Sequence, residues 1–294
     1  MRTTGVTKMA QRAGFLRRAV IVTLVAASPF APMLTGSSSA APTVGSLYSY
    51  TLTGVTTTPV ANGAEVNTGV PLKLVGNWTP SSVGINFVGD KTSKRSVAWA
   101  KPASGLTLNA AASDAVGAGI NFRYAAPATG ACYTDSRNIT QIGRFGSGLT
   151  QLKIQLSSCA GNKTAVFPEC RMVGANSTNA DLPKRGTQAL VNGATYVVKC
   201  FKGPDPATGQ TTLTLETTKV DAVNGNVTTV NTFPITRPGA MSSSGYLSIA
   251  NKYPMPAQSS NTDQFIGDVA KVAYCKAVAT DTLLICLDAE VPES

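Results

Sequence analysis

The chain has 294 residues, which is room for one large domain or two small ones, and a net charge of +10 at pH 7. Charged residues account for 14% of the chain, well below the roughly 25% of an average soluble domain. Histidine is absent. The sequence therefore excludes Ser-His-Asp and Cys-His nucleophile systems, histidine zinc sites and histidine pH switches.

Residues 1–40 have the three parts of a secretory signal: a basic start, an apolar run at 19–27 and small residues up to Ala40. Cleavage is predicted after Ala40, with Ser38 and Ala40 at the −3 and −1 positions. A membrane anchor is disfavoured, because Pro29 and Pro32 interrupt the segment and a span needs about 20 apolar residues. We expect a mature protein without a membrane span that is secreted, either extracellular or in the cell envelope.

Half of the positive charge belongs to this leader. Its five basic residues and no acid take the net charge from +10 to +5 when they are removed. The remaining basic residues are scattered, with no run longer than Lys94-Arg95 or Lys184-Arg185. This pattern argues against a nucleic-acid partner.

The segment 41–83 is rich in Thr, Gly and Val and is predicted to be an arm or a first strand. After it, apolar and polar residues alternate with a period of two, as in half-buried strands. Residues 151–157 are the clearest case, with Leu152, Ile154 and Leu156 on one face and polar side chains on the other. Similar candidates are Ser96–Ala100, Gly119–Ala125, Ile139–Phe145, Tyr196–Phe201, Thr212–Glu216, Asn226–Val230, Tyr246–Ala250, Val269–Tyr274 and Leu283–Leu287.

Turn-forming residues separate these strands, among them Gly161-Asn162 and Asn224-Gly225. No window after the leader has a convincing helical stripe, and no repeat or second core is evident. Many short strands with one polar face predict an all-β, two-sheet antiparallel sandwich.

Three stretches resemble the laminin-G-like, concanavalin-A-like jelly-roll domains of secreted bacterial proteins. They are Ile139–Phe145 with Gln151–Leu156, Asn192–Cys200 with Leu213–Glu216, and Tyr246–Ala250 with Asp263–Tyr274. The last contains Phe265-x-Gly-x-Val269, the most specific match; Thr195-Tyr196 stands where the family usually has Trp-His. The resemblance covers roughly residues 84–290 and implies a jelly-roll domain over 84–294.

The closing match also has a physical reading. In a sandwich, Phe265, Val269 and Val272 would fill the core. Gly267 would let the backbone bend or approach another strand closely.

Six cysteines follow the leader: Cys132, Cys159, Cys170, Cys200, Cys275 and Cys286. An even number in an exported chain predicts three disulfides, whereas a cysteine metal cluster lacks any C-x-x-C pair. Hairpin register favours Cys275–Cys286, with a turn at Thr280-Asp281, and Cys132–Cys159. These leave Cys170–Cys200, and related domains bridge the same two strands. The set Cys159–Cys170 with Cys132–Cys200 stays open.

Jelly-roll relatives include glycoside hydrolases, which cleave glycans with a pair of catalytic acids. The glutamates are Glu65, Glu169, Glu216, Glu290 and Glu293. No two share a strand at i, i+2 or i+4, and Asp263 and Asp268 would face opposite sides of a strand. We expect no enzymatic activity and interpret these acids as solvated rim charges.

The predicted cofactor set is none, with calcium as the alternative. Laminin-G-like folds often hold one calcium ion at the rim, but no ligand motif matches here. Aspartates predicted in loops are Asp90, Asp114, Asp181 and Asp263.

Two tryptophans could serve as sugar platforms. Trp99 shares a face with Val97, which favours the core, whereas Trp78 lies in a turn-like segment and is the weak candidate for ligand contact.

The resemblance and the missing acid pairs favour a secreted, non-catalytic recognition module for a glycan or an extracellular protein partner. An inert structural protein of the cell envelope is the alternative. A divergent glycan-cleaving enzyme that uses Glu216 ranks third.

Overall fold

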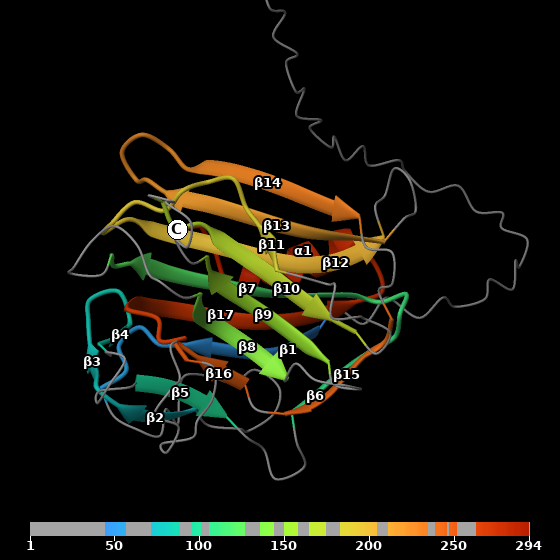
Figure 1. The fold of residues 1–294 in the computed structure, drawn as a ribbon, viewed down its shortest axis with the longest axis horizontal. Helices are drawn as coiled ribbons and strands as arrows, with labels where there is room; N and C mark the ends of the chain where they lie inside the picture. The colour runs from blue at the N-terminus through green and yellow to red at the C-terminus, as the bar shows by residue number, and fades with distance from the viewer. Residues whose placement is uncertain are drawn as a thin grey trace, which may run out of the picture. The chain divides into compact units, whose positions relative to one another are not determined.

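Strands dominate the backbone of the computed structural model. It describes residues 45–56, 72–88, 96–100, 106–126, 136–143, 150–157, 165–174, 183–204, 211–234, 239–245, 247–251 and 263–293. The strands form two large antiparallel sheets and one small one, and a single helix follows the last strand in the described part of the chain (Figure 1).

The larger sheet has eight strands. Its order is β14 (Val227–Pro234), β13 (Thr211–Val220), β12 (Thr195–Pro204), β7 (Ala115–Tyr124), β17 (Gly267–Ala277), β4 (Ile85–Phe87) and β3 (Trp78–Pro80), and β1 (Gly45–Thr51) also pairs with β17. Strands β1 and β3 come from the N-terminal segment, which therefore supplies part of this sheet.

The second sheet has seven strands. Its order is β11 (Lys184–Arg185), β10 (Pro168–Val173), β9 (Gln151–Leu156), β8 (Arg137–Gly143), β16 (Leu247–Ile249), β5 (Ser96–Ala100) and β2 (Lys73–Gly76). A separate pair is formed by β6 (Leu106–Ala110) and β15 (Met241–Gly245).

The inner faces of the two large sheets enclose the main hydrophobic core. Strand β7 contributes Ile120 and Phe122, and β9 contributes Leu152, Ile154 and Leu156, all fully buried. Two contacts join the sheets directly: the disulfide Cys170–Cys200, and the hydroxyls of Thr140 and Tyr274, which lie 2.8 Å apart. The chain is thus an all-β, two-sheet antiparallel sandwich braced by disulfides, as predicted.

The closing strand confirms its sequence reading. Phe265, Val269 and Val272 are fully buried in the main core. Gly267 has φ +139°, and a Cβ there would collide with the carbonyl oxygen of Arg123. Only glycine adopts such a backbone conformation readily, so this position needs its glycine.

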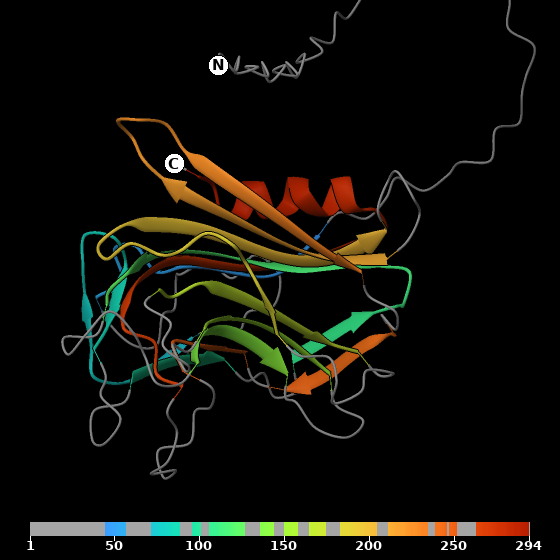
Figure 2. The ribbon, with the colours of Figure 1, turned by 45° about the horizontal axis from the view of Figure 1, so that its top comes forward.

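The prediction of a strand at Leu283–Leu287 is wrong. Residues Thr280–Glu290 form helix α1, which packs on the outer face of the eight-stranded sheet, away from the seven-stranded one (Figure 2). Leu283, Cys286 and Leu287 are its buried residues, spaced i, i+3 and i+4 so that they share one helical face. Five consecutive apolar residues concealed this spacing.

Two of the predicted disulfides are present. Cys275–Cys286 is confirmed as a pair, but it joins β17 to α1 and not the two strands of a hairpin. Cys170–Cys200 is also confirmed. Cys132 and Cys159 lie outside the described residues, as does the predicted signal at 1–40. Within the described ranges no helix is long and apolar enough to cross a bilayer.

Candidate functional site

The outer face of the seven-stranded sheet is polar. Side chains alternate along a strand. Lys153 and Gln155, each one residue after a core leucine or isoleucine (Leu152 and Ile154), therefore point away from the core. We call this surface the polar face; it comprises Gln141, Gln151, Lys153, Gln155, Glu169, Arg171 and Ser248, which lie on β8, β9, β10 and β16.

Most of the polar face is withdrawn from solvent. Gln151 is 3% exposed, Lys153 6% and Gln155 4%. Glu169 and Arg171, nearer the β11 edge, are half-buried. The alternation on β9 was predicted, but a buried polar side of the strand was not.

Hydrogen bonds and an ion pair connect the polar face across its strands. The Gln155 Nε2 donates to Glu169 Oε2 at 2.6 Å. The Gln151 Nε2 lies 3.5 Å from Gln141 Oε1, at the long limit of a hydrogen bond. Lys153 Nζ is 3.7 Å from a carboxylate oxygen of Asp263.

A buried amide network holds Asp263 beside the sheet. The backbone N–H of Asn138 donates to the Asp263 carbonyl at 2.9 Å, and the Asn138 side chain donates to the Asn251 carbonyl at 2.6 Å. Asn251 in turn donates to Gln264 Oε1 at 3.0 Å. These hydrogen bonds hold the backbone of Asp263 in place, and with it the carboxylate that pairs with Lys153.

In the described structure, the atoms of the polar face that are buried without a hydrogen-bond partner include Gln151 Oε1 and Ser248 Oγ. Leaving such a group unsatisfied costs about 1–3 kcal/mol. A face that served only to pack would favour apolar side chains.

The β11 edge of this face carries an aromatic ring and a guanidinium. The Arg185 Cζ lies 4.7 Å from the centroid of the half-buried Phe167 ring, and Arg185 stands opposite Glu169 in the sheet. Arg185 is exposed, so the edge presents positive charge to solvent.

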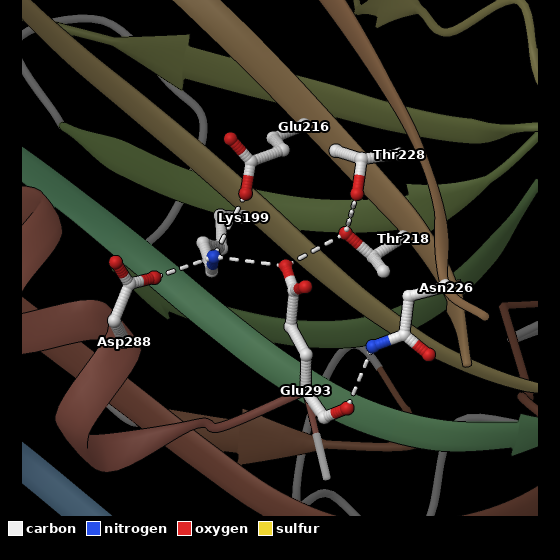
Figure 3. Close-up of polar contacts among 7 residues, drawn as sticks. All are labelled: Lys199, Glu216, Thr218, Asn226, Thr228, Asp288 and Glu293. Atoms are coloured by element: carbon white, nitrogen blue, oxygen red, sulfur yellow. Dashed lines mark hydrogen bonds and ion pairs between the residues drawn. The ribbon is translucent and has the colours of Figure 1, made fainter. Parts of the chain in front are cut away.

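A second charged cluster lies on the opposite side of the molecule, beneath α1. Lys199 Nζ is 2.7 Å from Glu216 Oε1, 2.6 Å from Asp288 Oδ1 and 3.4 Å from Glu293 Oε1 (Figure 3). Glu293 also accepts from Thr218 Oγ1 at 2.8 Å, and its carbonyl accepts from Asn226 at 2.9 Å.

The chemistry of this cluster is that of a structural ion pair. Burial disfavours the charged ammonium, but the hydrogen bonds to Asp288 and Glu216 outweigh it and raise the pKa of Lys199 above its ordinary value. Glu216, the candidate acid of the hydrolase hypothesis, is held by this lysine. The cluster fixes α1 and the residues after it to the sheet.

Among the acids interpreted as rim charges, Glu65 lies outside the described residues, and Asp268 and Glu290 are instead paired. Asp268 is buried and accepts from Arg123 Nε at 2.7 Å and from Asn86 Nδ2 at 3.1 Å. It lies on β17, whereas Asp263 precedes that strand and is paired with Lys153 of the other sheet, so the two acids do not share a strand.

Two of the four candidate calcium ligands, Asp114 and Asp263, lie in the described part of the chain, and both have basic partners. Partial burial opposes ionisation of Asp114, but the backbone N–H of Ala111 and the ammonium of Lys276 hold the pKa of Asp114 below its usual value. Asp263 is paired with Lys153, and Asp90 and Asp181 lie outside the described residues. Within the described ranges, no three His, Cys, Asp or Glu side chains are grouped to hold a metal ion.

The two tryptophans lie in different sheets. Trp78 on β3 stands opposite Phe87, is half-buried and packs against the main core. Its contact with a ligand stays a prediction. Trp99 stands on β5 opposite Ser248, and its side chain lies outside the described part.

Sequence reasoning missed the Gln155–Glu169 pair, although a signal existed. Opposed residues of an antiparallel hairpin lie equally far from its turn. A turn centred on Asn162, within the predicted turn, places Gln155 opposite Glu169, since each lies seven residues from it, as the β9–β10 register has it.

Comparisons with known proteins give only distant likenesses. No protein-family model matches the chain, and no curated protein does, so the laminin-G family is not confirmed. A marine PL-14 alginate lyase from Aplysia kurodai is 9% identical over 79% of this chain and 97% of that chain, with a TM-score of 0.40. Lectin II from Ulex europaeus is 12% identical over 70% and 92%, with a TM-score of 0.39.

The binding domain of botulinum neurotoxin DC, solved with rat synaptotagmin II, is 9% identical over 84% of this chain and 52% of that chain, with a TM-score of 0.45. These values are too low to transfer a function.

Proposed function

We propose that the protein is a secreted, non-catalytic recognition module that binds a glycan through the polar face. The observation that carries the proposal is the set of amide and charged groups on one sheet face, with the half-buried ring of Phe167 and the exposed Arg185 at its β11 edge. Sugar hydroxyls both donate and accept hydrogen bonds. An amide side chain can pair with either, because its oxygen accepts and its NH₂ group donates.

Three contacts support the non-catalytic part of this proposal. Hydrolysis of a glycan by paired acids needs one free acid and one free base or nucleophile. On the polar face, Glu169 accepts a hydrogen bond from Gln155 and Asp263 is paired with Lys153. The remote Glu216 is engaged by Lys199.

A glycan array with residues 41–294, run with and without calcium, tests the proposal. We expect retention of at least one glycan and no cleavage products. Gln155→Ala should weaken retention at least threefold, whereas Thr232→Ala, on the exposed strand β14 of the other sheet, should leave it unchanged. Absence of any retained glycan, or equal retention by both variants, would remove the proposal.

The burial of the polar face favours one alternative, a structural protein of the cell envelope that uses the sandwich as a disulfide-braced block. Cell fractionation separates the two functions. An envelope component stays in the wall pellet whatever soluble sugar is added, whereas a recognition module is released by its competing glycan.

A further inference from the structure

We infer that strand β14 is the contact surface of a dimer, in which it pairs antiparallel with β14 of a second copy of this chain. The strand lies on the eight-stranded sheet, whereas the polar face lies on the other sheet, so the inference does not depend on the proposed function. It comes from the exposure of this edge strand, from its lack of charge and from the symmetry of its sequence.

Strand β14 ends the eight-stranded sheet, and no described strand lies beyond it (Figure 1). Its eight residues pair with β13 in one unbroken register. Alternate residues of an antiparallel edge strand point their backbone N–H and C=O groups away from the neighbouring strand. Eight residues at about 3.3 Å each give about 26 Å of regular edge. A second strand can add to this edge along its whole length.

The other ends of the two large sheets are protected against such pairing. Strand β3 has three residues and ends in Pro80, β11 consists of Lys184 and Arg185, and β2 has four residues and begins with Lys73. Strand β1, beside β17, is buried at its centre. Short length, charge and proline commonly prevent sheet edges from pairing with other chains. Strand β14 is long and has no charged residue, and its proline, Pro234, comes only at the end.

The hairpin of β13 and β14 exposes apolar side chains. Val223 in its turn is 90% exposed, and Val227 and Val230 on β14 are each 57% exposed. In the described part of the chain, these valines are three of the seven large hydrophobic side chains that are exposed. Covering apolar surface stabilises an association, so a partner strand on this edge gains from the side chains as well as from the backbone.

The sequence of β14 is self-complementary. When the strand is placed antiparallel to itself about Val230, apolar residues meet apolar ones and polar residues meet polar ones. The pairs are Val230 with Val230, Val227 with Phe233, Thr228 with Thr232 and Thr229 with Asn231. Opposed β-branched and aromatic side chains and opposed threonines stabilise antiparallel strands. An unrelated peptide would match this pattern only by chance, so the pattern favours a second copy of the chain.

The side chains of β14 already point to the faces that this pairing requires. On the inner face, Asn231 Oδ1 accepts from the backbone N–H of Thr187 at 3.1 Å, and Phe233 packs against the main core. On the outer face, Thr228 Oγ1 lies 2.9 Å from Thr218 Oγ1. Opposed residues of an antiparallel pair share a face, so each copy keeps these contacts. Because both copies use the same strand about a two-fold axis, the assembly closes at two chains.

The mass of residues 41–294 in solution tests the dimer. Sedimentation velocity over a concentration series should show a species of twice the chain mass. Val230→Lys places like charges opposite each other at the two-fold axis and should weaken association at least tenfold. Val278→Lys adds the same charge at a side chain that is 60% exposed, between β17 and α1, and should leave association unchanged. A monomer at every concentration up to the solubility limit, or equal weakening by both variants, overturns the inference.

Cysteine cross-linking tests the register without a charged variant. Directly opposed residues of an antiparallel pair have Cα atoms about 4.5–5.5 Å apart, which a disulfide can span. Val230→Cys should therefore give a covalent dimer under mild oxidation. Thr228→Cys should not, because its two copies would lie about 13 Å apart, but a mixture of Thr228→Cys and Thr232→Cys should. Cross-linking of Val230→Cys that is no greater than that of Thr228→Cys overturns the pairing.

Discussion

Replacing Lys199 by methionine removes the cation at the centre of the cluster beneath α1 and keeps an unbranched side chain of similar length. Lys199 is 3% exposed, and its ammonium is shared by three carboxylates. Breaking a fully buried pair costs about 3–5 kcal/mol, and losing an exposed pair costs about 0–1 kcal/mol. The side chains left behind are 18% (Glu216), 33% (Glu293) and 60% (Asp288) exposed, so water partly solvates them.

We therefore expect Lys199→Met to lower the free energy of unfolding by about 2–3 kcal/mol. For a domain of this size the melting temperature should fall by about 4–12 °C. Because pairing raises the pKa of Lys199, its contribution is complete at neutral pH and is lost as the pH rises past the ordinary lysine value.

Guanidinium chloride unfolding at pH 7, followed by two probes with the disulfides intact, measures this loss. Asp288→Asn is the matched control, since its side chain is 60% exposed and should cost less than about 1 kcal/mol. A Lys199→Met protein within about 0.5 kcal/mol of wild type would refute the view that this cluster fastens α1 to the sheet.

Three further predictions concern the scaffold. Gly267→Ala, at φ +139°, should lower the free energy of unfolding in denaturant by about 2–3 kcal/mol. Gly54→Ala, with no atom within 4 Å of the new Cβ, should lower it by about 1 kcal/mol, and equal losses would contradict the close approach at Gly267. Replacing Cys170 and Cys200 together by alanine opens a 30-residue loop and should cost about 3.6 kcal/mol in the same measurement, and a loss under about 1 kcal/mol would argue against this pair as a brace. Hydrogen bonds from Asn224 and Val223 lower the pKa of Asp221 to about 2, so its stabilising effect is present above the ordinary value of 3.8 and fades as the pH falls toward 2; a carboxyl titration by NMR that gives a value near 3.8 would rule this out.

The strands and their inward faces could be read from the sequence because a period of two is a local signal. Leu152, Ile154 and Leu156 occupy the core as the alternation predicts. The same holds for Val269 in β17 and for Phe265, which lies two residues before that strand. A prediction from this alternation needs only the residues of one strand and the knowledge that one side of the strand faces a partner sheet.

Helix α1 was not readable in this way. The run Leu283–Leu287 is apolar at every position, so it fits a buried strand and a helix equally. What distinguishes them is the partner: Cys286 and Leu287 meet the outer face of β17 and β7, which the local sequence does not reveal.

The two polar clusters depend on residues far apart in the chain. Lys199 gathers Glu216, Asp288 and Glu293, and only the first of these could have been found, as its cross-strand neighbour on β13. The polar character of β9 is plain in the sequence. Its burial is not, because exposure is set by the packing of the whole chain.

A crystal structure of residues 41–294 with a bound oligosaccharide tests the central claim most directly. Our account predicts density for the sugar over β8, β9 and β10, with Gln155 within hydrogen-bonding distance of a hydroxyl. Sugar bound elsewhere, for instance beside Trp78 on β3 with the polar face unchanged, would contradict it.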